Sequence, residues 1–179
     1  VKVNGHCPSM GFCDVQQAAC AGLCDDHECE SISDLEQRLA CGMAVRGREG
    51  TIEPHSRTLC KGIGENKIPT DDIMFCTDDK HPYDLLHKGH IDYIVRKAIA
   101  LGADPILTIK VASHYAARYF LLNNKGAIAP GYLADFVVLD NLHDVNVEMV
   151  FKRGKLVYDG HDVEIAAPDI DPDILAGVL

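Results

Sequence analysis

The sequence lacks long apolar runs. None of its hydrophobic stretches approaches the roughly 20 residues that a membrane-spanning helix needs, so no membrane association is expected. The first ten residues also lack a basic region followed by an apolar stretch, which argues against a signal peptide. No internal repeat or low-complexity tract is present. The chain starts with Val1 rather than Met, inside an expected strand, and we therefore expect the true N-terminus to lie upstream.

Basic residues are few and scattered. There are 17 Lys and Arg against 27 Asp and Glu, and the formal net charge is −10. Proteins that bind the phosphate backbone gain affinity by neutralising phosphates, so nucleic acid as a polymer is not an expected partner, whereas a single base is compatible with this charge. A hydrophobic content of 47% and a mean hydropathy of −0.03 are typical of a soluble globular protein.

Eight cysteines form an even number, which would suit a disulfide framework. The chain is longer than the small domains that need disulfides, and Cys is a common core residue, so we favour reduced thiols and a cytoplasmic location. Cys20, Cys24, His27 and Cys29 could also hold a structural zinc ion. Their spacing lacks the separated ligand pairs of such sites, and helix packing explains Cys20 and Cys24 better.

Helices are predicted from capping and periodicity. A capping box at Ser33 and Glu36 predicts a helix that ends near Gly42. An apolar stripe predicts a helix over residues 91–99, and Asp104 before Pro105 starts another that continues to residue 122. Residues 51–70 read as loop or weak helix.

Short strands precede these helices, at VKVN, MAVRGREG and IMFCT. The alternation of strand and helix predicts an α/β fold with a parallel sheet. From residue 123 the pattern changes to turns and strands, with a hairpin turn expected at Arg153 and Gly154. The acidic residues 159–179 are broken twice by proline and read as a linker.

Polar side chains follow three of the expected strands. His6 follows VKVNG, His27 stands in CDDHE, and Asp78 in MFCTDD. The carboxyl ends of barrel strands converge on an active site, and neutral His and carboxylate are ligands for Zn, Fe or Mn. Taken singly, each His could be an ordinary hydrogen-bonded residue, and Asp78 and Asp79 could cap the next helix. Their shared position at strand ends favours a metal site.

Several segments resemble the adenine deaminases of the amidohydrolase superfamily. These segments are NGHCP, AGLCDDHE, MAVRGREGT, MFCTDDKHPYDLLHKGHIDYIVRKAIALG and GAIAPGYLADFVVLD. The resemblance implies that residues 1–122 form strands five to eight, with their helices, of the C-terminal half of a (β/α)8 metal-dependent hydrolase barrel. It also implies that residues 123–158 are part of a small β-sandwich, and that residues 159–179 are a linker or truncated C-terminal segment.

The same resemblance implies a reaction and roles for six residues. The reaction is the hydrolytic deamination of adenine to hypoxanthine and ammonia at a centre of two Mn, Fe or Zn ions. His6 and His27 would be metal ligands, and Asp78 would bind metal and act as the catalytic proton shuttle. Asp79, Arg48 and Glu49 would lie near the substrate. We also expect a homo-oligomer.

The HxH pair and the bridging carboxylate of that family have no counterpart in this chain, so the 179 residues alone are expected to be inactive. Two alternatives remain open. One is an amidohydrolase that acts on a cyclic amide such as a hydantoin or dihydropyrimidine. The other is a non-catalytic half barrel that a partner chain completes.

Overall fold

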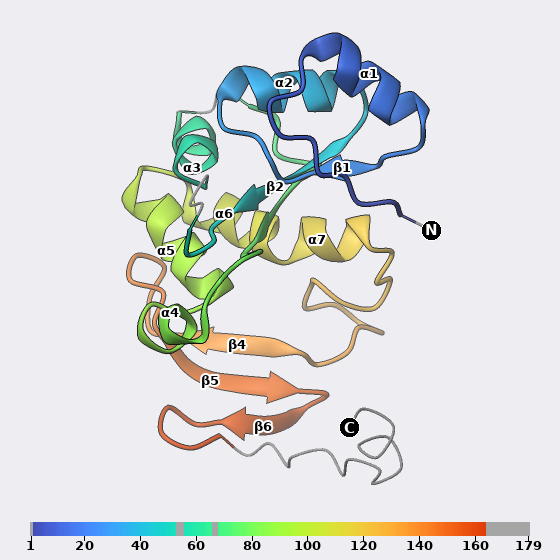
Figure 1. Cartoon of the computed structure of the whole chain (residues 1–179). Helices are drawn as coiled ribbons and strands as arrows, with labels where there is room; N and C mark the ends of the chain where they lie inside the picture. Colours follow the sequence, from blue (N-terminus) through green and yellow to red (C-terminus); the bar gives the residue numbers. More distant parts are fainter. Residues whose placement is uncertain (1, 53–55, 66–67, 164–179) are drawn as a thin grey trace, which may run out of the picture.

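The computed structural model describes residues 2–52, 56–65 and 68–163 (Figure 1). Helices and strands alternate up to Cys76, four helices follow up to Tyr119, and the remaining elements are strands. The first part comprises α1 (Phe12–Cys20), β1 (Asp25–Asp26), α2 (Ile32–Ala40), β2 (Ala44–Arg48), α3 (Ser56–Gly64), β3 (Ile73–Cys76), α4 (Pro82–His87), α5 (Ile91–Ala100), α6 (Pro105–Ala112) and α7 (His114–Tyr119). The second part comprises β4 (Phe136–Leu139), β5 (Val147–Lys152) and β6 (Lys155–Tyr158).

The first sheet is parallel, with strand order β1-β2-β3. A parallel bridge between Asn4 and Asp25 adds the N-terminal segment beside β1. Gly5 N donates to Asp25 O at 2.9 Å, and Cys24 N donates to Val3 O at 2.9 Å. Four segments therefore run side by side with their carboxyl ends at one edge, which confirms the predicted parallel α/β arrangement.

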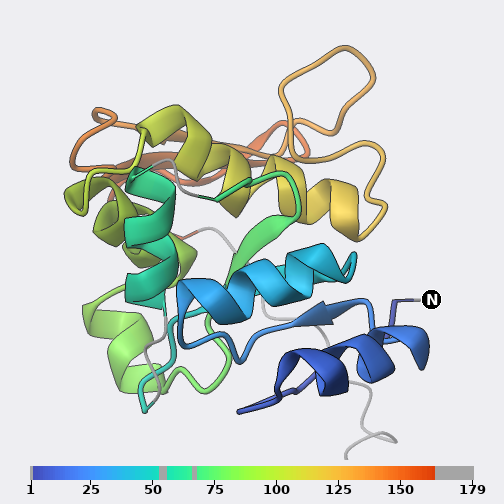
Figure 2. The same ribbon diagram turned by 90° about the horizontal axis from the view of Figure 1, so that it is seen from above.

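The helices bury one face of this sheet. The helices α2 and α3 pack on β2, and α5, α6 and α7 pack on β3 (Figure 2). Val45, Ile73 and Phe75 point into the resulting apolar core. Because successive strand side chains point to opposite faces, Arg46 and Arg48 share the other face. The opposite face thus carries charged side chains, and it positions the site described below.

The predicted capping box is wrong by two residues. Ser31 Oγ accepts from Asp34 N at 3.1 Å, and Asp34 Oδ2 accepts from Ser31 N at 2.9 Å, so α2 begins at Ile32 and not after Ser33. Leu35 of α2 is buried in the core. The predicted end at Gly42 is confirmed, since Gly42 has a φ of 74° immediately after the helix.

Two other helix predictions need correction. The helix predicted from Asp104 to residue 122 starts as expected, with Asp104 Oδ1 accepting from Leu107 N at 2.8 Å. It breaks at Ser113, whose backbone leaves the helical region while its Oγ donates to Ile109 O, and α7 ends at Tyr119. Residues 51–70 contain a regular helix, α3, while residues 53–55 and 66–67 lie outside the described part of the chain.

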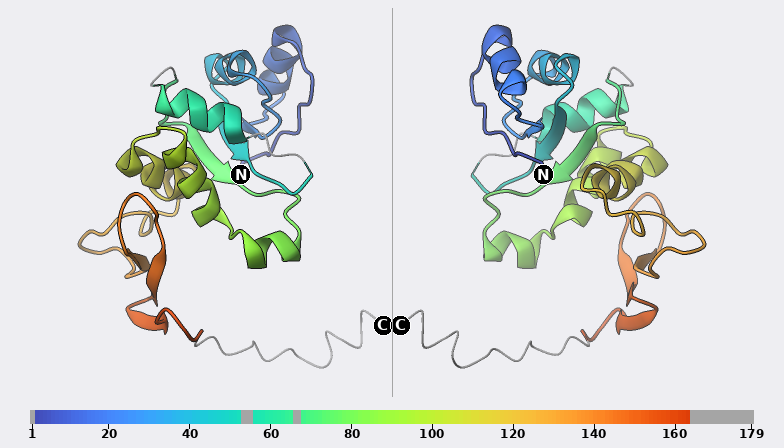
Figure 3. Two further views of the ribbon diagram at one scale, coloured as in Figure 1. Left: turned by 90° about the vertical axis from the view of Figure 1, so that its left-hand side faces the viewer. Right: turned by 90° about the vertical axis from the view of Figure 1, so that its right-hand side faces the viewer.

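The second sheet is antiparallel, in the order β4-β5-β6, and lies at the opposite end of the molecule from α1 and α2 (Figure 3). The predicted hairpin turn is confirmed, because Arg153 and Gly154 have φ values of 50° and 77° between β5 and β6. Asp135 accepts from Lys125 Nζ at 2.7 Å and from Arg153 N at 2.7 Å, and these bonds hold its pKa well below the usual range. Most of the predicted linker, residues 164–179, lies outside the described residues.

Within the described ranges, no helix combines the length and the apolar character required to cross a bilayer.

The approach of Gly5 to β1 predicts a cost for any side chain there. A Cβ on Gly5 would lie 2.2 Å from the backbone oxygen of Asp25, so Gly5→Ala must push the N-terminal segment away from the sheet. We expect a loss of about 1–3 kcal/mol, measured from the urea midpoint. Gly11→Ser is the control, because a Cβ there meets no atom closer than 3.8 Å and Ser suits a helix N-cap. Equal midpoints for both variants would contradict the close approach.

Candidate active site

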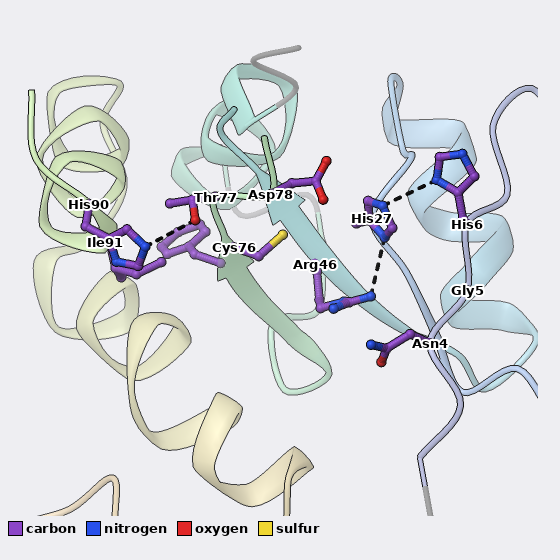
Figure 4. Close-up of a pocket in the computed structure, with 11 residues that line it drawn as sticks. Asn4, Gly5, His6, His27, Arg46, Cys76, Thr77, Asp78, His90 and Ile91 are labelled. Atoms are coloured by element: carbon purple, nitrogen blue, oxygen red, sulfur yellow. Dashed lines mark hydrogen bonds between the residues drawn. The ribbon is translucent and has the colours of Figure 1, made fainter. Parts of the chain in front are cut away.

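A cavity of about 510 Å³ opens at the carboxyl ends of the parallel strands (Figure 4). It is lined by Asn4, Gly5, His6, His27, Arg46, Phe75, Cys76, Thr77, Asp78, His90 and Ile91. Three of the predicted site residues, His6, His27 and Asp78, therefore share one cavity although they come from three different strand ends. The other three, Arg48, Glu49 and Asp79, are not among its lining residues.

Two histidines and a carboxylate form the metal-compatible group of the described residues. His6 Nδ1 lies 3.4 Å from His27 Nε2, and Glu28 Oε1 lies 3.1 Å and 3.2 Å from these two nitrogens (Figure 4 shows the histidines). All three ligand atoms are within 4.8 Å of one another. Two imidazole nitrogens and a carboxylate oxygen that converge in this way suit a divalent ion such as Zn, Fe or Mn.

Sequence reasoning missed Glu28. The available signal was its place directly after His27 at a strand end, but CDDHE offers three carboxylates and does not tell which one faces His6. Glu28 is only 4% exposed, so its charge needs partners. The histidines and Arg48 supply them.

A buried ion pair holds the two histidine-bearing segments together. Asp26 Oδ1 accepts from the backbone nitrogens of Cys7, His27 and Glu28 at 3.1, 2.9 and 3.2 Å. Asp26 Oδ2 accepts from Arg38 Nε at 3.0 Å, and a further Arg38 nitrogen donates to Cys7 O at 2.8 Å. Both charged side chains are fully buried. The pair therefore fixes the backbone beside His6 and the backbone of His27 in one unit.

Arg46 contacts both Asp25 and the His27 ring. Its guanidinium lies 2.7 Å from Asp25 Oδ1 and 3.3 Å from His27 Nδ1, and the Tyr119 hydroxyl donates to Asp25 Oδ2 at 2.6 Å. Burial, followed by this bond to Asp25, raises the pKa of Tyr119 well above its usual range, so the hydroxyl keeps its proton. Because a guanidinium only donates, His27 Nδ1 accepts here, and its proton lies on Nε2.

Arg48 lies between two carboxylates. One guanidinium nitrogen is 2.6 Å from Glu28 Oε1 and 2.9 Å from Asp78 Oδ2. Asp78 therefore reaches the histidine–carboxylate group through Arg48 and is not a member of that group. Asp78 has a φ of 51°, in the left-handed region that non-glycine residues seldom occupy, and its side chain is 40% exposed. The strained turn and the ion pair together place its carboxylate at the cavity.

Glu49 and Asp79 organise the loop that follows β2. Glu49 is buried, and its carboxylate accepts from Lys97 Nζ at 2.7 and 2.8 Å and from the Ser56 hydroxyl. Asp79 Oδ2 accepts from Ile52 N at 2.9 Å. A Cβ on Gly50 would overlap Asp79 Oδ1, so any larger residue there would displace the Asp79 carboxylate. These contacts are structural, and substrate binding by either residue stays a prediction.

The cysteines supply neither a nucleophile in the cavity nor the alternative zinc site. Burial raises the pKa of Cys76 to about 11, so this cavity-lining thiol is protonated at neutral pH. All eight cysteines are free thiols. Within the described residues His27 groups with His6 and Glu28, and not with Cys20, Cys24 and Cys29.

Comparison with known proteins gives the family. The amidohydrolase family profile matches residues 16–157, and the chain belongs to this family. Adenine deaminase from Kosmotoga olearia is 44% identical over 156 residues, 87% of this chain and 27% of that protein. Adenine deaminase from Desulforamulus reducens is 42% identical over 158 residues, 88% of this chain and 27% of that protein. The chain thus spans about a quarter of the length of these curated relatives.

Solved structures agree on the fold. A β-aspartyl dipeptidase from Fervidobacterium islandicum matches with a TM-score of 0.65 at 20% identity, over 90% of this chain and 48% of that one. Phenylurea hydrolase B matches with a TM-score of 0.57 at 16% identity, over 89% of this chain and 45% of that one. The predicted resemblance to amidohydrolases is confirmed, and the α/β fold belongs to the TIM-barrel-like hydrolases. Members of this superfamily generally depend on divalent metal ions.

The buried ion pair yields a stability prediction. Arg38→Met leaves the Asp26 carboxylate buried without its counter-charge, and we expect a loss of about 3–5 kcal/mol in the free energy of unfolding. Urea unfolding measures it. Arg57→Met is the matched control, because Arg57 is exposed on α3. A loss below about 1 kcal/mol, within the range of exposed ion pairs, would show that Asp26 needs no cationic partner.

Proposed function

We propose that the full-length protein carrying this chain hydrolyses adenine to hypoxanthine and ammonia. The observation that carries the proposal is the convergence of His6, His27 and Glu28 at one cavity, with Asp78 on its wall. The named relatives support the choice of reaction, since adenine deaminases are 36–44% identical over most of the chain.

We propose His6 and His27 as ligands of a divalent ion, Mn, Fe or Zn, with the Glu28 carboxylate beside them and Asp78 as a further ligand. The complete enzyme would hold two ions. An adenosine deaminase from Xanthomonas campestris was solved with bound zinc, and it matches this chain with a TM-score of 0.51 at 14% identity. Bound ions would supply a water that is deprotonated at neutral pH.

Metal binding by His27 Nε2 requires a change of tautomer. The Nε2 proton must move to Nδ1, and Nδ1 then no longer accepts from Arg46. Arg46 keeps its ion pair with buried Asp25, so the guanidinium has an anionic partner in both states. The exchange thus leaves no buried charge unpaired.

Asp78 is the proposed proton carrier. Its exposed carboxylate accepts a proton from the attacking water and delivers it to the departing amino group. Arg48 holds the carboxylate by the 2.9 Å contact, and it also holds Glu28. We retain Arg48, Glu49 and Asp79 as proposed residues of the substrate region. Their contacts support roles in shaping the loop and in orienting Asp78.

Several finer assignments belong to the same proposal. Residues 1–122 would be the C-terminal half of a (β/α)8 barrel, and residues 123–158 part of a β-sandwich. Segments outside this chain would complete the metal site, so these 179 residues alone would be inactive. Homo-oligomerisation and a cytoplasmic location stay predictions. So does the alternative of a non-catalytic half barrel that a partner chain completes.

Hydrolysis of a cyclic amide is the rival reaction, because one fold and metal scaffold can serve both deamination and amide hydrolysis. Steady-state assays of the full-length protein with adenine, hydantoin and dihydrouracil separate the two. Release of ammonia from adenine is the expected result. Turnover of a cyclic amide without turnover of adenine would replace the deaminase proposal.

The metal assignment predicts that His6→Ala and His27→Ala each lower both bound metal and activity in the full-length protein. Elemental analysis of the purified variants measures the metal. His87→Ala is the control, because His87 is an exposed residue of α4 that does not line the cavity. Full occupancy in both cavity variants would mean that the histidines serve only as hydrogen-bonding residues.

The proton-transfer role predicts different effects at the two neighbouring aspartates. Asp78→Asn should lower kcat by at least about 100-fold, because an amide retains the bond to Arg48 but cannot carry a proton. Asp79→Asn should be milder, because Asp79 Oδ2 only accepts from Ile52 N. The measurement is kcat with circular dichroism as a check on folding. A larger loss at Asp79 would reverse the assignment.

A further inference from the structure

The wall of the cavity across from the two histidines carries a second polar pair. Thr77 Oγ1 and His90 Nε2 lie 3.1 Å apart, and both residues line the cavity. Figure 4 shows them on the far side of Cys76 and Asp78 from His6 and His27. The pair lies outside the histidine–carboxylate group, and the proton transfer proposed above does not use it.

The turn that presents His90 is held from several sides. Gly89 has a φ of 101°, and a Cβ there would lie 2.4 Å from Asp92 Oδ2. His90 N donates to Asp92 Oδ1 at 2.7 Å. Arg96 pairs with Asp92 at 2.7 Å and donates to Lys88 O at 3.0 Å. The GHID segment thus forms a fixed turn at the start of α5, and little order must be gained when a ligand meets the imidazole.

Apolar side chains stand beside this pair. Ile91, directly after His90, lines the same cavity, and so does Phe75, two residues before Thr77. Phe75 is only 7% exposed, because most of its side chain packs into the core. A flat heteroaromatic ring needs an apolar surface for its faces and a few polar groups for its edge. This wall offers both, whereas the opposite wall offers the charged groups that suit a metal ion.

We propose that Thr77 and His90 form the subsite for the purine ring edge remote from the amino group that is removed. The inference rests on the proposed deaminase function. The reacting carbon must lie near the His6–His27 group, so the remainder of the ring extends across the cavity toward β3 and α5. The bond between Thr77 Oγ1 and His90 Nε2 sets the ring orientation of His90, and Nδ1 is left as donor or acceptor for a ring nitrogen.

The test uses the full-length metal-loaded protein and its variant His90→Phe, which keeps a planar ring and removes both nitrogens. Loss of one neutral hydrogen bond should raise the KM for adenine and the Kd for hypoxanthine about three- to tenfold. Metal content and kcat should stay within about twofold of the parent. Calorimetry with hypoxanthine gives the Kd without turnover.

Two further variants complete the experiment. Thr77→Val, nearly equal in shape, should raise the same Kd by a smaller factor, because it frees His90 without removing it. His87→Phe is the matched control, since His87 contacts Tyr83 on α4 and does not line the cavity. If His90→Phe fails to fold, Thr77→Val alone decides, and an unchanged Kd in that variant would overturn the subsite.

The outcomes separate the subsite from the reaction. An adenine-active parent whose KM and Kd are the same in His90→Phe and His87→Phe would overturn the subsite and leave the proposed function intact. A fall in kcat or in bound metal without a change in Kd would also overturn it, by placing His90 at the chemistry. A parent without adenine turnover would instead refute the proposed function, and the purine subsite with it.

Discussion

The buried pair of Asp26 and Arg38 is the constraint on which the site depends. The Asp26 carboxylate accepts hydrogen bonds from three backbone nitrogens and from Arg38. Arg38 also donates to Cys7 O, so the pair joins the N-terminal segment, β1 and α2. Burial of these charges is costly, and a well-packed apolar pair would often stabilise a fold as much. The ion pair differs from an apolar pair in that its hydrogen bonds have fixed geometry, and they hold the backbone at Cys7 and the backbone at His27 at defined distances. His6 and His27 face each other as a result.

Two more arginines, both on β2, also pair with carboxylates near the cavity. Arg46 lies beside Asp25 and His27, and Arg48 lies beside Glu28 and Asp78. Each of these three carboxylates therefore has an arginine neighbour. Without these partners the carboxylates would repel one another in a poorly solvated region. The net acidic charge of the chain therefore coexists with local neutrality at the cavity. A cation that enters competes with arginine for carboxylate oxygens and does not meet bare negative charge.

The strand ends could be predicted because the relevant patterns are local. The segment IMFCT before two aspartates predicts a strand, and the apolar stripe over residues 91–99 predicts a helix. In both cases the residues at the end of the element can be read from the local pattern. The choice between Ser31 and Ser33 as helix cap could not be made this way, since both precede an acidic residue by three positions. Only burial of Leu35 and Arg38 against the rest of the fold decides it. Glu28, Arg46 and His90 were missed for the same reason, because their roles come from neighbours 13 to 22 positions away.

The hydroxyl of Tyr119 meets Asp25 across 94 positions of sequence, and this contact has a consequence for the order of assembly. Contacts between such distant residues form late, because a long loop must close before they contribute. During synthesis the segment with His6 and His27 emerges well before α7. Its helices and its Asp26–Arg38 pair can form at once, since they join residues close in sequence. Asp25 can pair with Arg46 at this stage, but its second carboxylate oxygen gains the Tyr119 hydroxyl only after α7 has been made. The support behind the imidazole is therefore completed late, after the frame around it has closed.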